Sequence, residues 1–288
     1  MRLLVTGAGG QLGRDVVSAF VETGAHHDLV AASHDQLDVA DRDAVLQATG
    51  ALRPDLVVHT AAWTAVDACE GDAERAYRVN ALGTRHVAEG CRRVGAHLVY
   101  LSTDYVFDGT ATAPYHEWDD PNPLSVYGRS KLAGEREVLA IHADSTIVRT
   151  SWVCGAHGSN MLKTVLRLAA ERPELSFVDD QRGCPTFTED LADMIVRLGT
   201  ARLPGVFHVT NQGPTTWYGF ARDVLSAAGL NPDIVRPITT AELHPPRPAP
   251  RPANSVLDNA ALRMQGIPSL PEYHEPLART NKTLEAQA

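Results

Sequence analysis

Near its N-terminus the chain carries Leu3-Leu4-Val5-Thr6-Gly7-Ala8-Gly9-Gly10-Gln11-Leu12-Gly13, an apolar run that leads directly into a glycine-rich turn. Residues 11–22 follow with apolar side chains at helical spacing. Between a strand and a helix, Gly7 permits a tight turn, Gly10 lets backbone amides approach a pyrophosphate, and Gly13 lets the helix pack closely on its strand. The stretch therefore predicts a dinucleotide site. Its predicted cofactor contacts are Gly7, Gly10, Gln11, Leu12 and Gly13.

Short strand-like runs alternate with helix-like segments through the first half of the chain. The predicted strands are residues 3–6, 28–32, 56–60, 98–101 and 146–149. This alternation is typical of βαβ units and predicts an α/β fold, a Rossmann-type doubly wound parallel sheet with a smaller C-terminal substrate-binding domain. We expect residues 1–150 to form the NAD(P)-binding domain, with later segments returning to it, and residues 151–288 to form mainly the substrate-binding domain. The proline-dense segment 237–252 is predicted to be neither helix nor central strand, and is either a solvated linker or a loop that closes over a site.

Composition excludes several classes of protein. A formal net charge of -9 over 288 residues argues against nucleic acid as the main partner. The four cysteines are far apart, without a C-x-x-C pair, which favours reduced thiols over disulfides or a structural zinc site. No apolar stretch approaches the roughly 20 residues that would span a bilayer. We therefore expect a cytoplasmic protein that binds no membrane, no nucleic acid and no metal.

A tyrosine and a lysine four residues apart suggest the chemistry. On a helix Tyr127 and Lys131 share one face. Reduction of a carbonyl by hydride leaves an alkoxide that needs a proton, and a nearby ammonium stabilises the phenolate that tyrosine becomes on donating one. Thr103 follows a predicted strand, at the edge where α/β sheets bind ligands, and is placed to donate a hydrogen bond to the same oxygen. Each feature alone has a plain structural explanation, a solvated helix face or a strand-end cap, but the combination favours a reductase.

Taken together, these motifs resemble those of the extended short-chain dehydrogenase/reductases, and within them the dTDP-4-dehydrorhamnose reductase family. The similar stretches are residues 6–13, 61–67, 79–81, 102–109, 127–131, 149–153, 180–186, 215–218 and 251–255. They span nearly the whole chain. Residues 102–109 and 149–153 are specific to the subfamily, whereas the glycine turn and the Tyr/Lys pair are shared across the superfamily.

The resemblance implies reduction of the 4-keto group of dTDP-4-dehydro-6-deoxy-L-hexose with NADPH or NADH. The implied catalytic residues are Thr103, Tyr127 and Lys131, with Tyr127 as proton donor and Lys131 also reaching the nicotinamide ribose. The further cofactor contacts are Asp38, Val39, Ala61, Ala62, Trp63, Tyr127 and Lys131. The implied substrate contacts are Val66, Thr103, Asp104, Tyr105, Tyr127, Trp152 and Arg251, with Arg251 near the nucleotide end.

Cofactor and substrate keep alternatives open. The second predicted strand ends Ala31-Ala32-Ser33-His34, without the carboxylate that normally holds the ribose of NAD, and Arg14 follows the third glycine, so NADPH fits at least as well as NADH. A related 4-ketoreductase for an antibiotic deoxysugar or a dihydrostreptose-type sugar would have the same catalytic group. A non-catalytic, NADP-binding regulatory subunit has the same fold, and a homodimer is compatible with the sequence.

Overall fold

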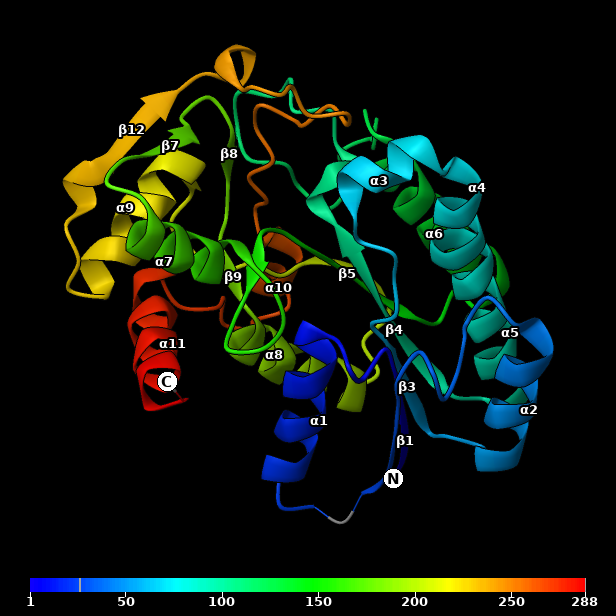
Figure 1. The fold of residues 1–288 in the computed structure, drawn as a ribbon. Helices are drawn as coiled ribbons and strands as arrows, with labels where there is room; N and C mark the ends of the chain where they lie inside the picture. Colours follow the sequence, from blue (N-terminus) through cyan, green and yellow to red (C-terminus); the bar gives the residue numbers. More distant parts are fainter. Residues whose placement is uncertain (26, 288) are drawn as a thin grey trace.

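The computed structural model describes residues 1–25 and 27–287, and its centre is a six-stranded parallel sheet with helices on both faces (Figure 1). The strands lie in the order β10-β5-β4-β3-β1-β2. They are β1 (Arg2–Thr6), β2 (Asp28–Ala32), β3 (Leu56–His59), β4 (His97–Thr103), β5 (Thr146–Thr150) and β10 (Gly205–His208). From β1 the chain builds first one side of the sheet and then the other, which is the doubly wound arrangement. The predicted α/β fold is confirmed.

Two layers of helices bury apolar side chains against this sheet. One layer contains α1 (Gln11–Glu22) and α8 (Thr188–Thr200), and the other contains α2 (Arg42–Leu52), α5 (Thr84–Val94) and α6 (Val126–Ile141). Successive residues of a strand face opposite layers, so Leu3 and Val5 pack in the first layer and Leu4 in the second. Because both faces are covered, a central strand such as β3 is buried at all of its residues.

Shorter elements connect the strands of the sheet in the first half of the chain and make up most of its second half. Between β3 and α5 lie α3 (Val66–Gly71), α4 (Ala73–Tyr77) and the π-helix η1 (Arg78–Gly83), and β4 leads into the 3₁₀ turn η2 (Asp104–Val106). The later helices are α7 (Met161–Glu171), α9 (Trp217–Ala227), α10 (Ala260–Met264) and α11 (His274–Gln287), with 3₁₀ turns η3 (Pro232–Ile234) and η4 (Thr240–Glu242). Three strand pairs join them: β7 (Leu175–Val178) with β12 (Val235–Ile238), β8 (Arg182–Gly183) with β11 (Thr215–Thr216), and β6 (Val153–Cys154) with β9 (Thr186–Phe187). Parts of α7, α9 and α11 share an apolar core of their own.

The five strands predicted from the sequence are all present, within a few residues of their predicted bounds. The sixth, β10, pairs with β5, so the segment after residue 150 also contributes to the central sheet. The proline-dense segment begins with the last two residues of β12, which pair with β7 outside the central sheet, and continues through η4 without a further helix or strand. Its last residues pack against the first half of the chain: Ala249 is 1% exposed, and its amide donates to Asp67 Oδ1 at 3.2 Å. That end of the segment is therefore not a solvated linker. Across residues 1–25 and 27–287, no helix has the length and apolar character needed to cross a bilayer.

Candidate active site

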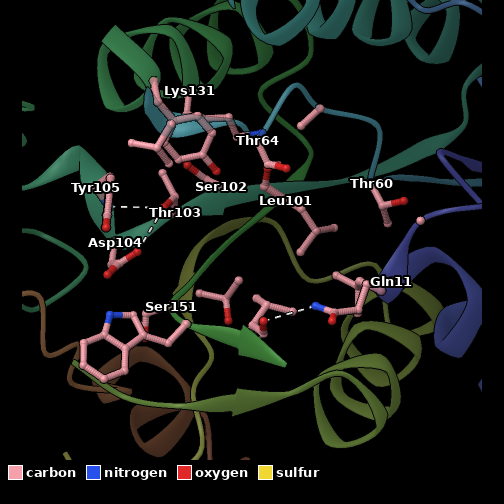
Figure 2. Close-up of a pocket in the computed structure, with 18 of the residues that line it drawn as sticks. Gln11, Thr60, Thr64, Leu101, Ser102, Thr103, Asp104, Tyr105, Lys131 and Ser151 are labelled. Atoms are coloured by element: carbon pink, nitrogen blue, oxygen red, sulfur yellow. Dashed lines mark hydrogen bonds between the residues drawn. The ribbon is translucent and has the colours of Figure 1, made fainter. Parts of the chain in front are cut away.

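A cavity of about 520 Å³ lies at the carboxyl ends of the central strands. It is bordered by Gly7 after β1, Thr60 after β3 and Thr103 at the end of β4. Figure 2 shows Gln11 and Thr60 at one end of this space and Thr103 with Tyr105 at the other. The cavity thus runs from the glycine turn to β4, along the sheet edge where α/β folds bind ligands.

Most of the residues predicted from the sequence line this cavity. They are Gly7, Gly10, Gln11, Leu12, Gly13, Ala62, Val66, Thr103, Asp104, Tyr105, Tyr127, Lys131 and Trp152. The lining residues that the sequence did not assign to the site are Thr60, Thr64, Leu101, Ser102, Thr150, Ser151, Val153, Gly158, Ser159 and Trp217. Thr60, Thr150 and Ser151 stand at or just after strand ends, which is a usable signal. Trp217 begins a helix far downstream, and although residues 215–218 are among the stretches that resemble the family, that resemblance did not place Trp217 in the site.

The glycine turn has the geometry of an anion cradle. Gly7 has φ +70°, and a side chain there would run into the backbone of Ala61. A Cβ at Gly13 would clash with the Gly7 carbonyl oxygen, so α1 can start close against β1 only with glycine at that position. The first turn of α1 has no side-chain cap, and free amides at a helix N-terminus favour a negatively charged group. These residues fit the pyrophosphate of a dinucleotide.

Helix α6 is held close to the end of β4 by its first turn. Ser125 caps the helix by accepting a hydrogen bond from the Gly128 amide at 3.1 Å. A Cβ at Gly128 would overlap the Tyr105 carbonyl oxygen, so α6 lies directly on η2. The Tyr127 ring consequently stands edge-on to that of Tyr105, with centroids 6.0 Å apart. This docking places Tyr127 at the Thr103 end of the cavity.

Lys131 is buried beneath this end of the cavity. Its Nζ donates to the Leu101 carbonyl oxygen at 2.6 Å and lies 4.3 Å from the centroid of the Tyr100 ring. Burial lowers the pKa of Lys131 to about 7, while the Glu135 carboxylate raises it. Glu135 also accepts two hydrogen bonds from Arg149, at 2.9 and 2.7 Å. A buried ion pair thus supports the lysine from the next turn of α6.

Burial raises the pKa of the Tyr127 phenol, and a hydrogen bond with Thr103 lowers it by less. In this structure, burial therefore outweighs any lowering of the Tyr127 pKa by the neighbouring Lys131. The physical reason is that desolvation of the phenolate outweighs the favourable contacts, and the Lys131 ammonium is directed at the Leu101 carbonyl oxygen. Tyr127 is fully protonated near neutral pH, which suits a proton donor.

Asp104 presents a buried carboxyl group to the cavity. Its Oδ1 accepts a hydrogen bond from Thr103 Oγ1 at 3.0 Å, whereas its Oδ2 has no hydrogen-bond partner among the described residues. Burial raises the pKa of Asp104 to about 7. A buried polar atom without a partner is costly, so this oxygen is suited to a polar group of a ligand.

Four predicted cofactor contacts lie outside the lining of the cavity. Asp38 is exposed and accepts a hydrogen bond from the Ala40 amide at 2.9 Å, and Val39 is buried against Gly83. The backbone of Ala61 faces Gly7. The backbone of Trp63 exchanges two hydrogen bonds with the side chain of Asn80, at 2.8 and 3.1 Å. The contacts of these residues with a cofactor stay predictions.

Arg251 is engaged by a carboxylate from the first half of the chain. Its Nη1 and Nη2 donate to the two oxygens of Asp67 at 2.6 and 2.8 Å, and Nη1 also donates to the Ala249 carbonyl oxygen at 2.7 Å. This pairing lowers the pKa of Asp67. Arg247 approaches the same carboxylate at 3.5 Å. Arg251 is not among the residues lining the cavity, and its predicted contact with the nucleotide end of a substrate stays a prediction.

The described residues offer neither a cluster of metal ligands nor a reactive cysteine. Within them, no three His, Cys, Asp or Glu side chains are grouped so that they could hold a metal ion. The four cysteines are free and buried, and burial raises the pKa of both Cys69 and Cys184 to about 11. Neither is therefore an activated nucleophile.

Comparison with known proteins gives one consistent family. Residues 1–286 match the family model described as the RmlD substrate binding domain. The dTDP-4-dehydrorhamnose reductase of Streptomyces griseus is 43% identical over 293 residues, covering 100% of this chain and 95% of the relative. A probable dTDP-4,6-dihydroxy-2-methyloxan-3-one 4-ketoreductase of Streptomyces antibioticus is also 43% identical, over 281 residues, 96% of this chain and 93% of the relative.

The fold is also similar to solved structures. The dTDP-4-dehydrorhamnose reductase of Bacillus anthracis, solved in complex with NADP, is 39% identical and superposes with a TM-score of 0.91. The match covers 97% of this chain and 98% of that one.

Proposed function

Because this chain belongs to the RmlD substrate binding domain family, we propose that it reduces the 4-keto group of dTDP-4-dehydrorhamnose, forming dTDP-L-rhamnose, with NADPH or NADH as reductant. One observation carries the proposal: the glycine turn and the group Thr103, Tyr127 and Lys131 face the same cavity. A dinucleotide cradle and a proton donor at one space are what a carbonyl reduction requires. The relative of known structure that holds NADP supports the class of cofactor.

The chain's own residues supply the proton and the charge stabilisation. When bound, the nicotinamide supplies the hydride that reaches the C4 carbon. Tyr127 donates its phenolic proton to the oxygen left at C4, and Thr103 Oγ1 donates a hydrogen bond to that oxygen. Lys131, one helical turn from Tyr127, would stabilise the phenolate electrostatically and would hold the nicotinamide ribose.

The remaining lining residues fit a polar sugar and a phosphorylated cofactor. Asp104 Oδ2 is suited to pair with a sugar hydroxyl, and Val66, Tyr105 and Trp152 enclose the ring. At the other end, Ser33 borders the glycine turn, with its Cβ 3.5 Å from the position of a Cβ on Gly9. A neutral residue there, together with the exposed cation of Arg14, favours the 2′-phosphate of NADPH. In this proposal residues 1–150 hold the cofactor, residues 151–288 mainly the substrate, and the protein acts in the cytoplasm.

A second candidate is a 4-ketoreductase acting on a different dTDP-linked deoxysugar. It is favoured by the 4-ketoreductase of Streptomyces antibioticus, whose sequence is as similar to this chain, at 43% identity, as that of the dTDP-4-dehydrorhamnose reductase of Streptomyces griseus. The catalytic residues would be the same, and only the contacts between the cavity lining and the sugar would differ.

One experiment tests the proposal and separates the two candidates. The protein is given NADPH and NADH in turn with enzymatically prepared dTDP-4-dehydrorhamnose, and cofactor oxidation is followed while the product is identified by nuclear magnetic resonance. We expect rapid oxidation of NADPH and formation of dTDP-L-rhamnose. Turnover only with other dTDP-4-keto sugars would favour the second candidate, and no turnover with any of them would refute the reductase.

A further inference from the structure

Trp152 has a backbone conformation that is unusual for a large residue. It follows β5, lines the cavity, and has φ +46°, in the left-handed region. Few residues other than glycine adopt this region, and a bulky one does so only where surrounding contacts impose it. The contacts that hold Trp152 in this conformation therefore also determine the shape of the cavity wall.

Trp217 provides the first of these contacts. The indole rings of Trp152 and Trp217 are stacked, with centroids 3.5 Å apart and an angle of 6° between their planes. Trp217 stands edge-on to Phe220, with centroids 6.3 Å apart, and packs against the apolar core shared by α7, α9 and α11. The ring of Trp152 thus rests on a second ring that is anchored in the later part of the chain.

Gly183 provides the second contact. A Cβ at this position would overlap Cε2 and Nε1 of the Trp152 indole, so the ring fits only because the side chain is absent. Gly183 lies in β8 and pairs with Thr215 of β11, two residues before Trp217. The same short antiparallel ladder therefore makes both the space for the Trp152 ring and the surface on which it stacks.

We propose that Trp217 and Gly183 are positioning residues, which hold the Trp152 indole at the sugar end of the cavity and so determine how tightly the sugar of the substrate is bound. The identity of the ligand rests on the proposed function, but the geometry does not. An indole in a fixed orientation offers a flat apolar face to the C–H face of a sugar ring. If the stack is lost, Trp152 loses the contact that holds its strained backbone, and binding of the sugar weakens.

Spectroscopy tests the stack without any ligand. Two stacked indoles couple and give an exciton couplet in the circular dichroism spectrum. We expect both Trp152→Phe and Trp217→Phe to abolish this couplet. Trp118→Phe is the matched control, because Trp118 is 59% exposed and stacks on His116 instead. A couplet that survives Trp217→Phe would overturn the inference.

Kinetics test the consequence for the substrate. Trp217→Ala is expected to raise KM for the dTDP-4-keto sugar about tenfold, which corresponds to about 1.4 kcal/mol. We expect kcat to change by less than about threefold and KM for NADPH to stay unchanged, since only uniform binding of the sugar is lost. Trp217→Phe, which keeps an aromatic surface and the fold, should recover most of the affinity. An equal rise in the KM of both substrates, or no rise in either, would contradict a positioning role.

Binding of dTDP-glucose, whose C4 bears a hydroxyl and cannot be reduced, separates this inference from the proposed function. We expect calorimetry to show binding by the wild-type protein and weaker binding by Trp217→Ala and Gly183→Ala. That result would support the inference even if the chain reduced no keto sugar, in which case only the proposed function would fail. Undiminished binding by both variants, or no binding by the wild type, would overturn the inference even in a protein that is an active reductase.

Discussion

Asp104 and Asp108 lie four residues apart, and the fold shifts the pKa values of their carboxyl groups in opposite directions. Burial raises the pKa of Asp104 to about 7. Asp108 accepts hydrogen bonds from the Thr110 amide, the Asn122 side chain and the Thr110 hydroxyl, and these lower its pKa. The two carboxylates therefore make opposite contributions to the dependence of stability on pH.

We predict that Asp104→Asn is more stable than the wild type at about pH 8 and close to it at about pH 4. The unfolded carboxyl group releases its proton near pH 3.9, whereas the folded one keeps it until about pH 7. Between these values the folded state binds more protons, so wild-type stability falls as pH rises. The gain in the variant is expected to grow across that window to at most about 4 kcal/mol. Thermal unfolding at a series of pH values measures it.

Asp108→Asn is the control for this prediction. Its folded pKa is lowered, so its carboxylate contributes stability above the unfolded pKa that is lost as the pH falls. We expect this variant to be less stable than the wild type near neutral pH. Stability changes of the same sign in both variants would contradict the assigned environments.

At the scale of elements, the position of α6 on η2 determines where the proton donor stands. Only glycine at position 128 lets the helix approach the Tyr105 carbonyl oxygen. We predict that Gly128→Ala lowers kcat/KM at least about a hundredfold, because moving Tyr127 by about 1 Å is enough for a loss of that size. Steady-state kinetics measure this.

Gly50→Ala is the matched control for α6. Gly50 is exposed in α2, and a Cβ there would meet no heavy atom within 4 Å. Alanine should stabilise that helix by about 1 kcal/mol and leave activity unchanged. Full activity in Gly128→Ala would show that the close packing of α6 on η2 is not needed for catalysis.

The end of the proline-dense segment is held against α3 by few contacts. Asp67 of α3 makes several of them. The carboxylate accepts hydrogen bonds from Arg251 and from the Ala249 amide. We predict that Asp67→Ala speeds hydrogen exchange of the Ala249 amide by roughly tenfold or more, because its acceptor is removed and the local opening free energy falls. Mass spectrometry of exchange measures this effect. Glu74→Ala, which removes an exposed carboxylate 3.9 Å from Arg78, should leave the exchange rate of the Ala249 amide unchanged. An unaltered rate in Asp67→Ala would show that Asp67 does not hold the segment in place.

At the scale of the whole molecule, the sequence predicted what local signals encode. Apolar runs followed by glycine or hydroxyl residues located the central strands and their carboxyl ends, and hence the cradle at Gly7 to Gly13 and the threonine at the end of β4. Spacing along a helix placed Tyr127 and Lys131 on one face. These features depend on neighbours within a few residues, and the structure brings them to one cavity.

What the sequence did not predict depends on long-range packing. Trp217 reaches the cavity because β11 pairs with β8, and nothing near Trp217 in sequence shows that pairing. The direction of the Lys131 ammonium and the raised pKa of Tyr127 both follow from burial by distant segments, which composition and spacing do not reveal. The Arg251–Asp67 pair likewise joins residues far apart in the chain.

The whole molecule joins a cofactor cradle at β1 to a proton donor on α6, so hydride and proton must reach the same carbonyl group, the hydride at its carbon and the proton at its oxygen. Transfer of deuterium from NADPH labelled at the transferable C4 position of the nicotinamide tests this joint function. With dTDP-4-dehydrorhamnose, we expect one deuterium at C4 of the sugar product, seen by nuclear magnetic resonance, and no product from Tyr127→Phe although that variant still binds NADPH. Product without deuterium at C4, or undiminished turnover by Tyr127→Phe, would contradict it.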